Sequence, residues 1–152
     1  MKDIIPLLKK IKILNVEIKS NSFISSGIEK KIIRFINKNK INHKTIISSF
    51  NPLVLRRIKK IDNSIWTGYL YSKVEVPMIL KTYFWIYFVK TDSFHPDFNF
   101  ASKKMVNWAK RRGMKTIIYT INTKEQYQKV KSWGVDGIFT DDPEKLRQIQ
   151  CE

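Results

Sequence analysis

Two polar residues of one short run, Glu17 and Lys19, have the types and the spacing to take part in phosphate chemistry. Residues 13–19 alternate apolar and polar side chains, which predicts a β-strand with Asn15, Glu17 and Lys19 on one face. A carboxylate oxygen suits a hard divalent cation such as Mg²⁺ or Ca²⁺, and an ammonium group two residues further on suits a phosphodiester oxygen. On spacing alone, a buried Glu–Lys ion pair or a plain strand edge is the commoner explanation.

Short β-branched runs alternate along the chain with segments of helical periodicity. The predicted strands are residues 13–19, 45–50, 65–71, 89–94, 115–121 and 136–140. The predicted helices are residues 3–12, 27–39, a segment beginning at 52, 77–88, 101–112, 124–133 and 143–150. Such alternation indicates a parallel sheet covered by helices, either a βα-barrel or a doubly wound open sheet. No Gly-rich phosphate loop follows a strand, which counts against the open sheet.

The composition indicates one basic domain spanning residues 1–152. The chain has 29 Lys and Arg against 13 Asp and Glu, for a formal net charge of +16. That charge favours anionic partners, although many lysines fall in predicted helices, where a solvated outer face is the simpler explanation. The longest apolar run, residues 83–89, is too short to span a bilayer. Because no secretory segment is recognised either, we expect a cytoplasmic protein.

Six short motifs, in order and sensibly spaced, resemble the C-terminal part of the glycerophosphodiester phosphodiesterase family. They are Leu-Asn-Val-Glu-Ile-Lys at 14–19, Ile-Ile-Ser-Ser-Phe-Asn-Pro at 46–52, Trp-Thr-Gly-Tyr-Leu at 66–70, His-Pro at 95–96, Tyr-Thr-Ile-Asn at 119–122, and the segment 135–143. The resemblance covers about residues 3–147. It implies a TIM-type (β/α)8 barrel that is incomplete, with strands three to eight and their helices. A complete barrel of this type needs about 250 residues.

The resemblance also implies roles for individual residues. Glu17 corresponds to a metal ligand, for Mg²⁺ or Ca²⁺, and Lys19 to the residue beside the phosphate. Tyr119 takes the place of the family's tryptophan at the substrate mouth, and Ser49 is assigned with it to substrate binding. The implied reaction is metal-dependent hydrolysis of glycerophosphodiesters to an alcohol and glycerol 3-phosphate.

The family's first motifs do not occur in this sequence. His-Arg-Gly and His-Asp supply the two histidines of general acid/base catalysis, and Glu-x-Asp supplies two further metal ligands. The sequence has only His43, expected on the surface, and His95, part of a His-Pro that the resemblance places at the end of the sixth barrel strand in a structural role. We therefore assign no catalytic residue, and we expect weak or absent metal binding and negligible hydrolysis by this chain alone. Whether it is an enzyme is left open by the sequence.

The missing strands would leave the predicted strands 13–19 and 136–140 as open edges. We therefore expect a separate chain or a swapped copy to complete the barrel, or else the isolated chain to be weakly stable. Two other functions stay open: a non-catalytic remnant that binds phosphate or phospholipid headgroups through Lys19 and the basic surface, and a nucleic-acid-binding α/β module. Steep salt dependence of binding to generic DNA would favour the latter.

Overall fold

The structure, a computed structural model, describes residue 8, residues 11–74 and residues 90–151. The chain divides into two compact units, and each is described by itself. The first unit comprises Met1–Tyr69 with Val76–Thr91, and the second comprises Leu70–Glu75 with Asp92–Glu152.

Six strands follow one another in the order of the sequence, β1-β2-β3-β4-β5-β6. They are β1 (Leu14–Glu17), β2 (Thr45–Ser49), β3 (Trp66–Tyr71), β4 (Ser93–Pro96), β5 (Lys115–Ile118) and β6 (Gly137–Ile138). The pairs β1–β2, β2–β3, β4–β5 and β5–β6 are all parallel. A doubly wound sheet would reverse its order at a switch point, so the sequential order confirms an incomplete TIM-type barrel.

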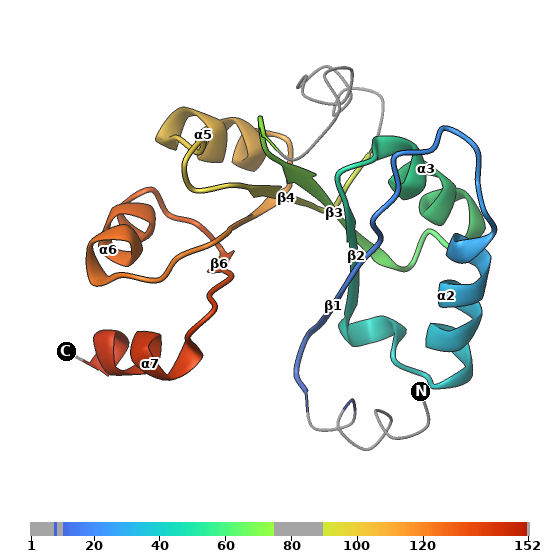
Figure 1. The fold of residues 1–152 in the computed structure, drawn as a ribbon, viewed down its shortest axis with the longest axis horizontal. Coiled ribbons are helices and arrows are strands. Elements are labelled where there is room, and N and C mark those ends of the chain that lie inside the picture. The colour runs from blue at the N-terminus through green and yellow to red at the C-terminus, as the bar shows by residue number, and fades with distance from the viewer. Residues whose placement is uncertain (1–7, 9–10, 75–89, 152) are drawn as a thin grey trace. The chain divides into compact units, whose positions relative to one another are not determined.

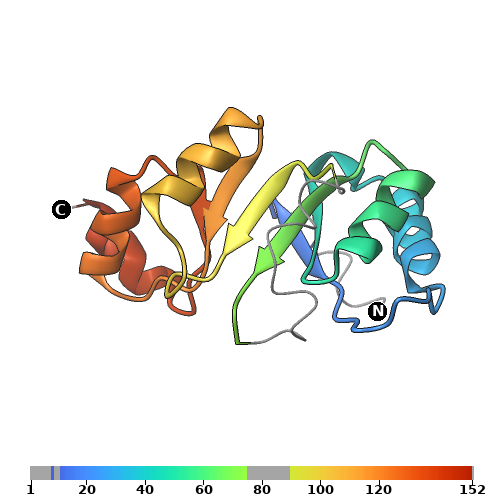
Figure 2. The same cartoon turned by 90° about the horizontal axis from the view of Figure 1, so that it is seen from above.

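The first unit packs two helices on one face of its strands, as Figures 1 and 2 show from two sides. These are α2 (Ile28–Lys38) and α3 (Pro52–Ile61), and a 3₁₀ turn at Asn42–Lys44 precedes β2. The start of α3 is set locally, because the Asn51 side chain accepts a hydrogen bond from the amide of Leu53. The buried core of this unit is Leu8, Ile18, Ile33, Ile36, Ile41, Ile47, Val54, Ile58 and Ile65.

The second unit carries the helices α5 (Lys103–Arg111), α6 (Lys124–Ser132) and α7 (Pro143–Cys151). Gly113 and Gly134, at φ of 72° and 74°, follow the ends of α5 and α6 and confirm the helix stops predicted there. A cluster of apolar side chains forms its core: Val106, Ile118, Ile121, Val130 and Leu146.

One strand lies later in the sequence than predicted. β4 covers Ser93–Pro96, whereas the side-chain pattern predicts a strand at 89–94 followed by a loop. The resemblance, which places His95 and Pro96 at the end of the sixth barrel strand, is confirmed. Proline is uncommon inside strands because it cannot donate to the ladder. Here it ends the strand, and its carbonyl accepts a hydrogen bond of 3.2 Å from the amide of Tyr119.

The remaining elements agree with the prediction to within a few residues, and β6 is reduced to two residues. The predicted helix 77–88, and 3–12 apart from residues 8, 11 and 12, lie outside the described residues. No helix in the described ranges is both long and apolar enough to cross a membrane.

Candidate functional site

Glu17 and Lys19 are both exposed at the carboxyl end of β1. Ile18 between them is buried, at 3% exposure, and packs in the core of the first unit. The backbone of Ile18 is fixed on both sides, because its amide donates to the carbonyl of Ser48 at 2.8 Å and its carbonyl accepts from the hydroxyl of Ser49 at 2.7 Å. Burial of Ile18 and these two bonds together hold the stretch that carries the carboxylate and the ammonium group.

Ser48, which was not among the predicted binding residues, shares the register of Glu17. The two residues pair across β1 and β2, and Ser48 is fully buried. Its hydroxyl accepts a hydrogen bond of 3.0 Å from the Asn15 side-chain amide. Asn15 lies two positions before Glu17 on the same strand face, and its Oδ1 is buried without a hydrogen-bond partner among the described residues. Alternation along β1 already places Asn15 on the face of Glu17, but the register that adds Ser48 comes only from the fold.

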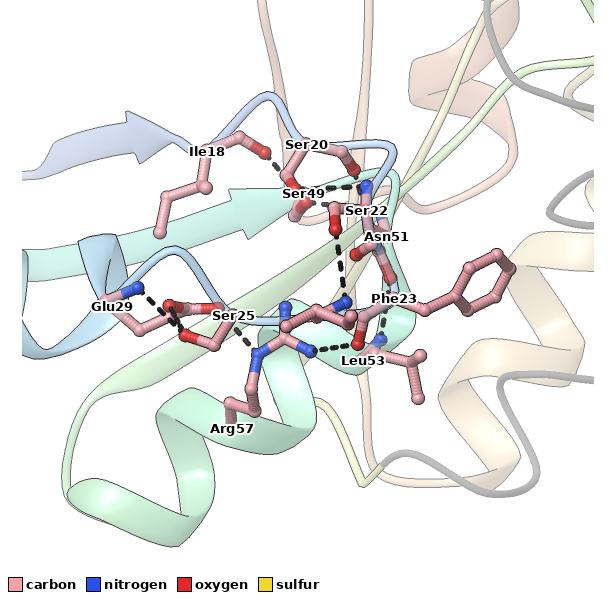
Figure 3. Close-up of polar contacts among 12 residues, drawn as sticks. Ile18, Ser20, Ser22, Phe23, Ser25, Glu29, Ser49, Asn51, Leu53 and Arg57 are labelled. Atoms are coloured by element: carbon pink, nitrogen blue, oxygen red, sulfur yellow. Dashed lines mark hydrogen bonds and ion pairs between the residues drawn. The ribbon is translucent and has the colours of Figure 1, made fainter.

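Ser49, the serine chosen from the sequence, has a structural role in the fold. It is buried, its hydroxyl donates to the carbonyl of Ile18, and the same oxygen accepts from the amide of Asn51 at 3.1 Å (Figure 3). Along β2 it alternates with Ser48 and shares its strand face with Ile47, which lies in the core under the helices. Contact between Ser49 and a substrate stays a prediction. In the fold, the Ser49 side chain positions the backbone of Ile18.

Tyr119 belongs to the second unit, where it follows β5 directly. It is half-buried, and its hydroxyl donates to the carbonyl of Tyr71 at 3.2 Å. The amide of Asp97, just after β4, donates to the same carbonyl at 2.9 Å. Tyr119 and the Asp97 carboxyl group therefore stand at neighbouring strand ends, and the carboxyl was not singled out in the sequence.

Asn122 joins the ends of β5 and β6. Its side-chain amide donates to Asp141 at 2.9 Å, and its Oδ1 accepts from the Thr140 hydroxyl and from the Asp141 amide, each at 3.1 Å. Asp142 accepts from the amide of Lys145 at 3.0 Å and so caps the start of α7. The hydrogen bonds of Asn122 therefore connect the segment after β5 to the segment after β6.

The two histidines occupy different environments. His43 is exposed in the turn before β2, at the opposite end of the strand from Ser48 and Ser49. His95 is fully buried in β4, and its Nε2 lies 2.9 Å from the Ser93 hydroxyl oxygen. Its Nδ1 has no hydrogen-bond partner among the residues described. Burial lowers the pKa of His95 to about 4, so the ring is neutral at physiological pH and is not exposed to a solvent-borne substrate.

The described residues do not supply a complete metal site. They contain no group of three or more His, Cys, Asp or Glu side chains that could hold an ion. Mg²⁺ and Ca²⁺ take six or more oxygen ligands in all. Glu17 is therefore a single candidate ligand within the described part of the chain.

The chain belongs to the glycerophosphoryl diester phosphodiesterase family, whose model matches residues 5–145. It is 35% identical over 137 residues to a glycerophosphodiester phosphodiesterase of Caldanaerobacter subterraneus subsp. tengcongensis, covering 88% of this chain and 54% of that protein. A glycerophosphodiester phosphodiesterase of Bacillus altitudinis is 28% identical, with 91% of this chain and 56% of that protein covered.

The fold is also shared with solved structures. An Oleispira antarctica phosphodiesterase, in complex with the product sn-glycerol-3-phosphate, superposes with a TM-score of 0.68 at 24% identity. The match covers 92% of this chain and 56% of that one. The chain thus spans about half the length of the curated relatives it matches.

Proposed function

We propose that this chain is the part of a glycerophosphodiester phosphodiesterase domain that binds the phosphate of the substrate. The observation that carries the proposal is the pair of exposed charged residues, Glu17 and Lys19, held at the carboxyl end of β1 in a chain of this family. In a βα-barrel this end of the strands faces the active-site mouth. Lys19 would neutralise a phosphodiester oxygen, and Glu17 would be one oxygen ligand of Mg²⁺ or Ca²⁺.

Tyr119 and Ser49 complete the proposed substrate-binding set. The Tyr119 ring would border the glycerol or alcohol moiety, with its hydroxyl already bonded to the carbonyl of Tyr71. Ser49 would act through its bond to Ile18, which fixes the backbone between Glu17 and Lys19.

Hydrolysis needs more than this set provides. Cleavage requires an acid to protonate the leaving alkoxide and a base on the opposite side, and each proton-transfer group contributes about 10²–10⁴-fold to the rate. His95 is buried and has a pKa of about 4, which makes it a poor substitute. We therefore propose that the 152-residue chain hydrolyses glycerophosphodiesters negligibly by itself.

A separate segment or a swapped copy would complete the barrel at β1. Support comes from the order of the strands, in which β1 is terminal, and from Ile13, which is 65% exposed beside it. Such an open parallel edge with apolar neighbours favours pairing with another strand. A cytoplasmic location remains a prediction from the sequence, and cell fractionation tests it.

Binding and turnover should be measured separately. We expect sn-glycerol 3-phosphate to bind the chain in calorimetry, and Lys19→Gln to weaken that binding about tenfold or more, since a charge-assisted hydrogen bond contributes about 1.5–3 kcal/mol. Lys38→Gln is the matched control, because Lys38 is exposed in the last turn of α2, away from the carboxyl end of β1. An equal effect of both substitutions would contradict a phosphate site at Lys19.

The turnover assay measures release of glycerol 3-phosphate from glycerophosphocholine, with Mg²⁺ or Ca²⁺ present. We expect a rate near background for the chain and no further loss in Glu17→Ala. Robust turnover that disappears in Glu17→Ala would overturn the proposed inactivity. Binding without turnover, even after an upstream segment bearing the two histidines is supplied, would instead favour a non-catalytic phosphate-binding remnant.

A further inference from the structure

The loop after β1 exposes two large apolar side chains next to each other. Phe23 is 54% exposed and Ile24 is 81% exposed. Single exposed apolar residues are ordinary on protein surfaces, but a cluster on one projecting loop is informative. The loop begins directly after Lys19, at the end of the first unit where the candidate phosphate-binding residues lie.

A polar network fixes the backbone of this loop. The side-chain amide of Asn51 donates to the carbonyls of Ser20 and Ser22, at 3.1 Å and 2.9 Å. Arg57 of α3 donates from Nη1 to the carbonyl of Phe23 at 3.2 Å. Figure 3 shows the ring of Phe23 directed away from these bonds. Hydrogen bonds therefore fix the carbonyls of Ser20, Ser22 and Phe23, whereas the Phe23 side chain takes no part in this network.

The anchor of the network is itself buried. Arg57 Nε lies 2.6 Å from Glu29 Oε1, and the hydroxyl of Ser25 donates to Glu29 Oε2 at 2.6 Å. The Glu29 residue is only 1% exposed. Because the buried Glu29 carboxylate fixes this loop, its apolar tip has a defined position before any partner binds. Less conformational entropy is then lost on binding.

Exposed cations lie beside this loop. An open pocket of about 420 Å³ is lined by Ser25, Gly27, Lys30, Arg57, Lys60 and Ile61. Glu29 neutralises Arg57, whereas Lys30 and Lys60 are exposed and make no ion pair within the described part of the chain. The surface therefore combines an apolar tip with two exposed ammonium groups.

We propose that this surface, comprising Phe23, Ile24, Lys30 and Lys60, docks on an anionic lipid bilayer. Phe23 and Ile24 would enter the interface between headgroups and acyl chains, while Lys30 and Lys60 would contact lipid phosphates. Charge complementarity favours this partner, since the chain carries a net charge of +16 and an anionic bilayer supplies both a negative surface and an apolar layer. The proposal goes beyond phosphodiester binding, because it assigns a membrane contact to a separate set of residues.

Vesicle sedimentation with the full 152-residue chain tests the proposal. We expect binding to mixed phosphatidylglycerol–phosphatidylcholine vesicles and much weaker binding to pure phosphatidylcholine vesicles. The double variant F23S/I24S should weaken binding to the mixed vesicles about tenfold or more. The reason is that serine, unlike Phe or Ile, gains little free energy on moving from water into the apolar layer of the bilayer. The matched apolar control is V74S, because Val74 is 75% exposed elsewhere on the chain and should have little effect.

A second pair of variants separates a defined surface from general electrostatic attraction. K30E/K60E and K103E/K104E change the net charge by the same amount, and all four lysines are exposed. A lysine near an anionic membrane contributes about fivefold to affinity, so K30E/K60E should reduce binding much more than K103E/K104E. Equal losses in the two pairs would overturn the proposal, leaving only non-specific attraction of a basic chain.

Direct insertion can be followed with a polarity-sensitive dye on I24C in a Cys151→Ser background, since Cys151 is the chain's single cysteine. We expect a blue shift on mixed vesicles for I24C and none for a dye on K104C. If F23S/I24S leaves vesicle binding unchanged but alters the oligomeric state, or pairing with a barrel-completing segment, the loop is a protein-docking surface and the membrane proposal is wrong. Circular dichroism of each variant confirms that the fold is retained.

Discussion

Arg57 and Glu29 form an ion pair of 2.6 Å between α3 and α2, with the Glu29 side chain 2% exposed and the Arg57 side chain 23% exposed. The same arginine holds the carbonyl of Phe23. One side chain therefore joins the packing of the two helices to the conformation of the loop that follows the candidate phosphate-binding residues.

Arg57→Ala should destabilise the chain because it leaves the buried Glu29 carboxylate without its cation. Breaking a fully buried pair costs about 3–5 kcal/mol, and the partial exposure of Arg57 brings the expected loss to the lower end of that range. Urea unfolding measures the change, with Arg56→Ala, an exposed neighbour in α3, as the matched control. A loss no larger than the control's would contradict the assigned role of the pair.

The stability of the chain should fall in acid partly through Glu29. Burial raises the pKa of this carboxyl, but hydrogen bonds from Ser25, its own amide and Arg57, with the Arg57 charge, bring the pKa below its ordinary value of 4.5. A depressed folded-state pKa stabilises the fold above the unfolded pKa, and this stabilisation is lost as the pH falls through the folded pKa. Unfolding free energies of the chain and of Glu29→Gln should therefore draw together as the pH falls below the ordinary value of 4.5; parallel curves would refute the linkage.

Ser49→Ala should loosen the stretch between Glu17 and Lys19. The substitution removes the hydroxyl donor of the buried Ile18 carbonyl, and an unsatisfied buried group costs about 1–3 kcal/mol. We expect that loss in unfolding free energy, faster amide exchange at Lys19 and weaker glycerol 3-phosphate binding. Ser132→Ala is the control, because its hydroxyl is exposed and caps only the carbonyl of Lys129. Retained exchange protection in Ser49→Ala would show that Ile18 is held by other contacts.

His95 should stay neutral well below its ordinary titration range. Burial lowers its pKa from 6.5 to about 4, so the unfolded chain binds a proton that the folded chain does not. The free energy of unfolding should accordingly fall as the pH decreases from about 6.5 to 4, and His95→Gln should show a smaller slope. NMR titration of the ring provides the direct measurement, and an apparent pKa near 6.5 would contradict the burial.

Removal of divalent cations should not change the thermal stability of this chain. The described residues lack a group of three potential ligands, and a ligand that binds only the folded state raises stability only when its concentration exceeds the dissociation constant. We expect the same Tm in EDTA and in millimolar Mg²⁺ or Ca²⁺, for the chain and for Glu17→Ala alike. A rise in Tm with metal that is lost in Glu17→Ala would reveal a metal site at Glu17.

The sequence by itself determined the local elements and the candidate charged pair. Alternation of side chains in β1 placed Glu17 and Lys19 on one strand face, and Pro52 and Gly113 marked where a helix begins and where another ends. These features depend on backbone geometry over a few neighbouring residues. The side-chain pattern placed β4 a few residues too early, because the burial of His95 and the bond to the Pro96 carbonyl depend on residues distant in sequence. The His-Pro motif, by contrast, marked the end of this strand correctly.

Only the tertiary structure decided which distant residues act together. The sequential strand order, the pairing of Glu17 with Ser48 and the place of Ser49 on the helix-covered face of β2 follow from strand register, which no local pattern specifies. The same holds for the loop at Phe23, whose carbonyl is held from 34 residues away by Arg57. The sequence shows two neighbouring apolar residues at Phe23 and Ile24. The fixed conformation of their loop requires long-range hydrogen bonds, and these form only once α2, α3 and the strands have packed.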